Sequence, residues 1–305
     1  MSAALPVAGA DLAALASDPN ACTGVQAPAK INLFLHVTGR RDDGYHLLQS
    51  LFVPLDWCDT LHLRRRDDGL LRRHDLGPAL PDDDLCLRAA RAFQQASGSA
   101  FGADIWVDKA LPSGAGLGGG SSDAAAVLRT LNRLWGLDWP PERLAALGLT
   151  LGADVPFFLQ GQPAWVEGVG ERLRPVTIQP RRFVLLKPPQ GLSTPQVFRA
   201  LPASCRTPPV SCEAVLAHDA AADLCDLFGH NDLQGPAVAL EPQVQQALDW
   251  LQAQGLRPRM SGSGSTVFAV LPPAHPAPEL PAPWQDAGWL LRVCAMCSPY
   301  GAKLV

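Results

Sequence analysis

Residues 111–123 read Leu-Pro-Ser-Gly-Ala-Gly-Leu-Gly-Gly-Gly-Ser-Ser-Asp, and no other segment of this 305-residue chain restricts the fold as strongly. Five glycines in the seven positions 114–120 disfavour a helix or a strand, because each glycine loses much backbone entropy on ordering. Good helix formers follow from Asp123 to Leu128, and Ser121 or Ser122 is a suitable N-cap. A glycine loop that leads into a helix N-terminus presents unpaired N–H groups and a positive dipole end, which suits phosphate.

Three interpretations of this glycine loop compete. The first is a flexible linker, although linkers do not usually run from a strand straight into a capped helix. The second is dinucleotide binding, because Gly114, Gly116 and Gly119 satisfy G-x-G-x-x-G. No clear parallel βαβ unit surrounds them, however, and Asp138 does not end an evident strand. A Walker-type loop is excluded, because Gly120 stands where its lysine would be. The third is a nucleoside triphosphate loop of another kind, which the rest of the chain favours.

The chain around the loop mixes strands and helices without a regular βαβ period, which indicates an α+β fold. The predicted strands are 31–37, 47–55, 105–107, 183–186, 266–271 and 290–297, and the predicted helices are 82–96, 122–135 and 241–254.

The length exceeds that of most single domains, so two domains that share a cleft are expected. Residues 1–20, rich in Ala, Pro and Asp, are predicted to be a flexible extension. We place the first domain at 21–180 and the second at 181–305, with a proline-rich passage at 188–209 close to the boundary.

Composition narrows the possible partners. Hydrophobic residues make up 47% of the chain, and a formal net charge of −4 gives no reason to expect nucleic acid. The short basic clusters 64–66 and 72–73 are interpreted as a solvated hairpin or loop. No apolar run approaches the roughly 20 residues of a membrane span, and the N-terminus lacks the basic start of a signal peptide. We therefore expect no membrane partner.

The eight cysteines are scattered, with one close pair at Cys294 and Cys297. A zinc site would need a second close pair or nearby histidines, so reduced thiols are the better interpretation. These thiols favour a cytoplasmic protein, and we expect a monomer or a weak homodimer.

Three separated segments resemble the three motifs of the GHMP kinases, a superfamily that includes galactokinases, homoserine kinases and mevalonate kinases. They are 27–33 (Ala-Pro-Ala-Lys-Ile-Asn-Leu), the loop at 112–123, and 260–268 (Met-Ser-Gly-Ser-Gly-Ser-Thr-Val-Phe), in the right order. Residues 39–46, 151–157 and 231–233 are similar to the R-x-D-G-Y-H, G-A-D-V-P and N-D-L segments of the branch that acts on a cytidine diphosphate-linked methylerythritol. The resemblance covers residues 25–299.

The resemblance implies a two-domain GHMP kinase fold. Its N-terminal domain would be a ribosomal-S5-like α/β domain and its C-terminal domain a ferredoxin-like α+β domain, with the active site in the cleft between them. It further implies that ATP, with Mg²⁺ bridging the phosphate oxygens, phosphorylates a hydroxyl of a small metabolite.

The ATP side would consist of Lys109 and the loop. The loop residues concerned are Pro112, Ser113, Gly114, Ala115, Gly116, Leu117, Gly118, Gly119, Gly120, Ser121 and Ser122. No protein ligand of Mg²⁺ can be named, and Ser121 and Ser122 are only candidates. Asp84 stands where related enzymes commonly have an asparagine near adenine. An ionised aspartate cannot donate a hydrogen bond, which puts the contact with the base there in question.

Asp154 lies in an otherwise apolar stretch, where an unpaired charge would be costly. One interpretation is a helix N-cap. The resemblance implies instead that Asp154 is the general base on the substrate hydroxyl, with Lys30 as its partner. A lysine within about 4–6 Å would keep the carboxylate ionised and steady the developing alkoxide.

The other substrate contacts also come from the resemblance. His46 would read the edge of cytosine, while Tyr45 and Phe198 would stack on its faces; loop or core packing is the alternative for each. Asn32 and Thr194 would contact the methylerythritol phosphate side. The segment Gly262, Ser263 and Gly264 would close the floor of the site.

Three alternative functions remain. Another GHMP kinase would have no need of the Gly44-Tyr45-His46 segment, and a catalytically dead sensor would lack Lys30 or Asp154. An oxidoreductase would rest on G-x-G-x-x-G alone.

Overall fold

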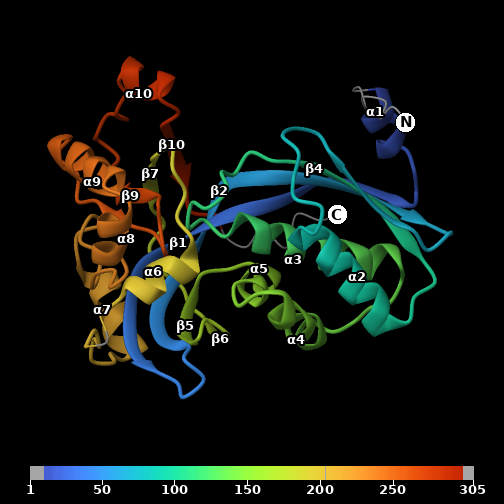
Figure 1. The fold of residues 1–305 in the computed structure, drawn as a ribbon, viewed down its shortest axis with the longest axis horizontal. Helices are drawn as coiled ribbons and strands as arrows, with labels where there is room; N and C mark the ends of the chain where they lie inside the picture. The colour runs from blue at the N-terminus through green and yellow to red at the C-terminus, as the bar shows by residue number, and fades with distance from the viewer. Residues whose placement is uncertain (1–9, 203, 298–305) are drawn as a thin grey trace.

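The computed structural model describes residues 10–202 and 204–297, which form two sheets with helices packed against them (Figure 1). The first half of the chain contains α1 (Ala10–Ala16), β1 (Ala21–Arg40), β2 (His46–Arg66), β3 (Leu71–Asp75), α2 (Leu85–Ser97), β4 (Gly102–Asp108), α3 (Gly119–Leu134), α4 (Pro141–Leu151), α5 (Val155–Gln160), β5 (Ala164–Gly168) and β6 (Arg172–Pro175). The second half contains β7 (Arg182–Lys187), α6 (Thr194–Ala200), α7 (Cys212–Ala221), α8 (Gln234–Leu240), α9 (Gln243–Ala253), β8 (Arg259–Met260), β9 (Val267–Val270), α10 (Ala282–Asp286) and β10 (Leu290–Ala295).

These elements confirm the predicted α+β class. Within the flexible extension predicted at 1–20, residues 1–9 lie outside the described residues, and Ala10–Ala16 form the short helix α1. The division at 180/181 remains our proposal. It is supported by the strands, since the first sheet draws all of its strands from residues 21–175 and the second from residues 182–295.

The first sheet is organised around the long antiparallel pair β1 and β2. The other edge of β2 pairs with β5 through Leu48–Phe52 and with β4 through Thr60–Arg66, and β3 and β6 complete the sheet. Residues 27–37 of β1 are all buried, so a polar residue in this run needs a partner. Lys30 and Asn32, two residues apart, face the same side of the strand.

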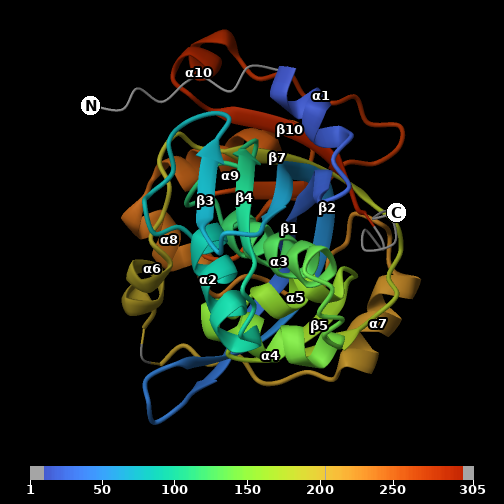
Figure 2. The ribbon, with the colours of Figure 1, turned by 90° about the vertical axis from the view of Figure 1, so that its right-hand side faces the viewer.

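Helices α2, α3, α4 and α5 lie together on one face of the first sheet (Figures 1 and 2). The small residues Ala124, Ala125 and Ala126 of α3 are fully buried. The predicted N-cap was wrong: α3 begins at Gly119, and its N-cap is Gly118 with φ of 73°. Only a glycine adopts that conformation readily, so the helix starts inside the loop, and Ser121 and Ser122 lie in its first turn.

The second sheet has the strand order β10-β7-β9-β8, with all pairs antiparallel. Its apolar residues, such as Val184 and Val267, share a buried cluster with Leu35 and Val37 of β1. Strand β1 therefore contributes to the cores of both halves, and residues of β1 lie where the two halves meet.

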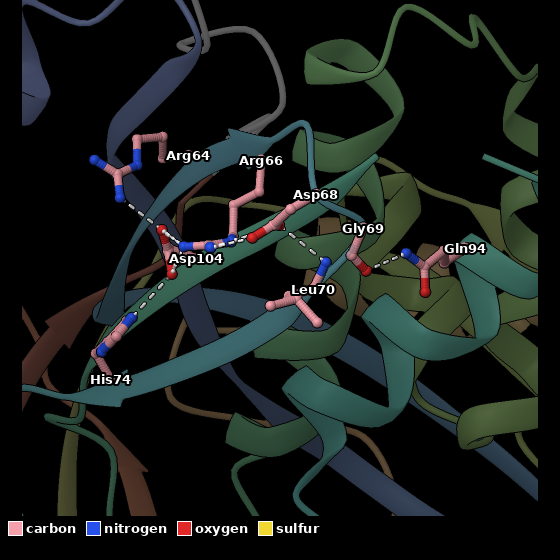
Figure 3. Close-up of polar contacts among 8 residues, drawn as sticks. All are labelled: Arg64, Arg66, Asp68, Gly69, Leu70, His74, Gln94 and Asp104. Carbon is pink, nitrogen blue, oxygen red and sulfur yellow. Dashed lines mark hydrogen bonds and ion pairs between the residues drawn. The ribbon is translucent and has the colours of Figure 1, made fainter. Parts of the chain in front are cut away.

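The basic clusters 64–66 and 72–73 were expected to be solvated, and the structure corrects this for Arg66 and Arg73, whose side chains are 19% and 8% exposed. The carboxylate of Asp104 is almost fully buried and pairs with Arg64 at 2.7 Å, Arg66 at 3.0 Å and His74 at 3.2 Å (Figure 3). Hydrogen bonds from these groups outweigh the effect of burial and lower the pKa of Asp104. The cluster ties β2, β3 and β4 together at the end of the sheet.

All eight cysteines are free thiols. None of the helices in the described part of the chain combines the length and apolar character that a membrane crossing requires.

Candidate active site

The glycine loop passes between Lys30 of β1 and the turn at 261–265. Gly114, Gly116 and Gly118 have φ of 61°, 72° and 73°. A Cβ atom at Gly116 would lie 2.5 Å from the carbonyl oxygen of Ser261, and one at Gly118 would lie 2.9 Å from the ring of Phe158. Glycine is therefore required at both positions by backbone conformation and by space.

Four successive carbonyl groups of the loop accept hydrogen bonds from other parts of the protein. The donors are Leu192 N to Gly114 O at 3.0 Å, Thr266 N to Ala115 O at 3.2 Å, Ser261 Oγ to Gly116 O at 3.3 Å, and Lys30 N to Leu117 O at 2.9 Å. For the N–H groups of residues 114–118, the described residues provide no acceptor. The first N–H groups of α3 add to this set, because a helix cannot satisfy them internally. The loop thus directs donors, and not acceptors, toward a ligand.

Lys30 is the cation at the centre of the site. Its Nζ lies 2.6 Å from Asn32 Oδ1 and 3.6 Å from Asp154 Oδ2. The side chain of Lys30 is 6% exposed, whereas that of Asp154 is 29% exposed and remains open to a ligand. Asn32 is fixed in turn by a 3.0 Å bond from its Nδ2 to Ser50 Oγ. The predicted pair of Lys30 and Asp154 is brought together at contact distance.

Asp154 occupies the N-cap position of α5, but its side chain makes no capping hydrogen bond. The N-cap interpretation therefore does not explain this carboxylate. Its φ and ψ of −84° and −14° are helical, which differs from the extended conformation of most N-caps. The carboxylate is instead directed to Lys30.

Lys109 forms ion pairs with two carboxylates of the protein itself. Its Nζ lies 2.7 Å from Asp123 Oδ2 and contacts Asp59 Oδ2, and Asp59 Oδ1 accepts the N–H groups of Ala110 and Leu111 at 2.7 Å each. Burial would lower the pKa of Lys109, but the two carboxylates outweigh it and raise the pKa. Burial raises the pKa of Asp123 and the Asp59 carboxylate adds to this effect, whereas Lys109 opposes it. This triad anchors the entry of the loop and the start of α3.

Asp84 is the N-cap of α2. Its Oδ1 accepts the N–H of Leu87 at 3.1 Å and pairs with Arg73 Nη1 at 2.8 Å. Both contacts belong to the fold, so Asp84 has a structural role apart from any nucleotide.

The turn at 261–265 closes the site from the second half. Ser261 Oγ accepts the N–H of Asn32 at 3.2 Å and also donates to the loop carbonyl of Gly116. Ser263 Oγ lies 2.7 Å from Thr194 Oγ1. Gly264, with φ of 84°, packs against Met260, where a Cβ atom would lie 2.7 Å from Sδ.

The aromatic group lies at the tip of the β1–β2 hairpin and on α6. The rings of His46 and Phe198 are stacked with centroids 5.2 Å apart at 26°, and Tyr45 is 66% exposed. Partial burial, with a further effect of Arg40, lowers the pKa of His46, which favours the neutral imidazole. A neutral ring can both donate and accept hydrogen bonds.

Comparison with known proteins agrees with this arrangement. Residues 84–162 match the GHMP kinases N terminal domain, and residues 213–288 match the GHMP kinases C terminal family. A protein of Variovorax paradoxus named 4-diphosphocytidyl-2-C-methyl-D-erythritol kinase is 55% identical over 280 residues, covering 88% of this chain and 93% of the relative. One of the same name from Methylibium petroleiphilum is 60% identical over 251 residues, covering 80% and 83%. The chain belongs to the 4-diphosphocytidyl-2-C-methyl-D-erythritol kinase family.

The solved structures show the same relationship. A crystal structure of a 4-(cytidine 5'-diphospho)-2C-methyl-D-erythritol kinase matches with a TM-score of 0.74 and 38% identity, covering 89% of this chain and 98% of the other. Homoserine kinase from Cytophaga hutchinsonii matches with a TM-score of 0.65 at 16% identity, covering 92% and 96%, which shows the shared fold alone. This member of the family is a small-molecule kinase with the two GHMP domains.

Several residues that shape the kinase site were not predicted from the sequence. Ser261 links β1 to the glycine loop, and Asp59 binds the loop entry. Neither residue carried a clear signal. The strand around Asp59 also holds Asp56, Thr60 and His62, and the partners of Ser261 are distant in the sequence.

Proposed function

We propose that this kinase transfers the γ-phosphoryl group of ATP to the 2-hydroxyl of 4-diphosphocytidyl-2-C-methyl-D-erythritol, giving the 2-phosphate and ADP. The reaction belongs to the non-mevalonate route to isoprenoid precursors. One observation carries the proposal: the glycine loop, in which the N–H groups of residues 114–118 have no acceptor among the described residues, is bonded at Leu117 to Lys30, and Lys30 pairs with Asp154. Phosphate binding and hydroxyl activation are therefore available at one place.

The chemistry needs an in-line oxygen nucleophile and stabilisation of charge on the transferred group. Asp154 accepts the proton of the substrate hydroxyl, whose oxygen attacks the γ-phosphorus as the bond to ADP breaks. The ammonium of Lys30, 3.6 Å from Asp154, stabilises the alkoxide that develops. The N–H groups of the loop hold the non-reacting phosphate oxygens through hydrogen bonds.

Mg²⁺ fits this site only as an ion held largely by the nucleotide. Among the described residues no cluster of three His, Cys, Asp or Glu could hold a metal, and Mg²⁺ commonly takes most of its ligands from phosphates and water. Ser122 Oγ is buried without a hydrogen-bond partner in the described part of the chain, so it is one hydroxyl oxygen that the protein could offer. The bound ion would neutralise charge on the phosphates.

The hairpin tip and α6 would hold the cytidine. Replacing His46 or Phe198 with Ala should raise KM for the cytidyl substrate by about 5- to 150-fold, since the loss of one stacking or edge contact costs about 1–3 kcal/mol. KM for ATP should stay within about twofold, because neither ring touches the glycine loop. His62→Ala, in the same strand β2 but at its opposite end, is the matched control. Equal weakening of both substrates would show that the cytosine site lies elsewhere.

The direct test is release of ADP from Mg-ATP with a panel of acceptors: the cytidyl compound, homoserine, mevalonate and galactose. Turnover of the cytidyl compound alone supports the proposal. Turnover of another acceptor would retain the kinase chemistry and reject the roles of Tyr45, His46 and Phe198. Binding of ATP without turnover of any acceptor would favour a sensor.

The remaining proposals concern the setting of the enzyme. Asn32, Thr194 and the segment Gly262–Gly264 would face the methylerythritol side, since they surround Lys30 or adjoin the turn beside it. We further propose a cytoplasmic monomer or weak homodimer, which is consistent with eight free thiols.

A further inference from the structure

Asn231 lies where β1 meets the second half of the chain, and the mechanism above gives it no role. Its segment forms a parallel bridge with Leu35. Leu35 N donates to His230 O, and Asp232 N donates to Leu35 O, both at 2.9 Å. The residue is 6% exposed, and a buried amide side chain must find hydrogen-bond partners within the protein.

Those partners lie on the turn that closes the active site. Asn231 Nδ2 donates to the carbonyl oxygens of Met260 and Gly262, each at 2.8 Å. Its Oδ1 accepts the N–H of Leu233 at 2.9 Å, which fixes the orientation of the amide. One NH₂ group therefore binds two carbonyls that are two residues apart, and it sets the curvature of the chain between them.

Gly262 is in close contact with the reacting groups. A Cβ atom at this position would lie 3.2 Å from Gly116 O, 3.3 Å from Asn32 Oδ1 and 3.5 Å from Lys30 Nζ. Any displacement of Gly262 would therefore change the surroundings of the Lys30 ammonium, whereas its contact with the glycine loop is to a carbonyl oxygen and not to the N–H donors.

The chain that precedes Asn231 is fixed independently. The guanidinium of Arg259 donates to the carbonyl oxygens of Leu227, Phe228 and Gly229, and also to that of Leu33 in β1. The backbone around Asn231 is thus held on β1, so its side chain projects from a rigid base.

We propose that Asn231 is a positioning residue for phosphoryl transfer, whose amide holds Gly262 at a fixed distance from Lys30 and Asn32. The inference rests on the proposed function, because it takes Lys30 as a group that acts on the reacting hydroxyl. It assigns a role to the Asn-Asp-Leu segment at 231–233.

The test is Asn231→Asp, which keeps the shape and the acceptor for Leu233 but replaces two donors with an oxygen. We expect kcat to fall about 10- to 100-fold, as is typical when a catalytic group is misplaced by a fraction of an ångström to 1 Å. KM for ATP should stay within about twofold, because the donors of the glycine loop remain. The matched control is Gln234→Glu, which introduces the same charge nearby and keeps the oxygen that accepts Met260 N at 3.0 Å. Its kcat should stay close to that of the wild type.

Asn231→Ser removes the amide donors without adding a charge. It is the variant to be measured if Asn231→Asp does not fold. Unchanged kcat in a folded variant would overturn the proposal, and so would failure of both variants to fold, which would show a role in folding alone. A parallel loss of kcat in Gln234→Glu would also overturn it. All variants are compared on the acceptor that the wild type phosphorylates. If that acceptor is not the cytidyl compound, the proposed substrate is rejected, but the test of the role of Asn231 is unaffected.

Discussion

Replacing Asp154 with Asn should lower kcat by about 10²- to 10⁴-fold, the usual contribution of a general base. The amide has nearly the shape of the carboxylate, but it cannot take the proton of the substrate hydroxyl. KM for ATP should change little, because the phosphates are bound by the loop and not by Asp154. Steady-state release of ADP, with the concentration of each substrate varied in turn, measures both quantities.

The matched control is Asp138→Asn. Asp138 is an exposed residue beyond the far end of α3, and asparagine tolerates its φ of 48°. The 16 residues of α3 span about 24 Å, and Asp138 lies near the end of the helix away from the glycine loop, so the kcat of this variant should match that of the wild type. If Asp154→Asn turns over within about twofold of the wild type, Asp154 is not the base.

Replacing Lys109 with Met should lower the free energy of unfolding by about 3–5 kcal/mol, the usual cost of removing one partner from a buried ion pair. Asp59 and Asp123 are both buried and would be left without their shared cation. Urea denaturation followed by circular dichroism at neutral pH measures the effect. The double variant Lys109→Met/Asp123→Asn should recover part of the loss, because one of the two carboxylates is then gone.

Lys187→Met provides the control, because Lys187 is also buried but no carboxylate pairs with it among the described residues. Its Nζ donates only to Pro189 O, at 2.9 Å, and burial lowers its pKa. We expect its loss to change the free energy of unfolding by no more than about 1.5 kcal/mol. Full stability of Lys109→Met with a raised KM for ATP would instead make Lys109 a direct ligand of the nucleotide.

The sequence predicted those parts of the site in which the residue type itself, within its neighbouring residues, allows few structural roles. Five glycines in seven positions have few explanations, and a carboxylate in the apolar run around Asp154 demands a partner. The N-cap of α3 was missed because Ser ranks above Gly at that position in isolation. Tertiary contacts at Gly118 decide otherwise, since a side chain there would clash with Phe158.

The remaining contacts could not be predicted, because they join residues far apart in the chain. Ser261 meets Asn32, and Asp59 meets Leu111, through pairings that only the folded topology brings about. The Arg64–Arg66 cluster shows the same limit, because its partner Asp104 lies on another strand. Charge patterns along a sequence do not specify which charges will meet across a sheet.

The shared strand β1 has a mechanical consequence. It is paired with β2 through most of its length, it carries Lys30 and Asn32, and at Leu35 it is bonded to residues 230–232 of the other half. A hinge between the two halves would have to break those bonds only a few residues from Lys30. We therefore expect the two halves to keep their relative positions through the catalytic cycle.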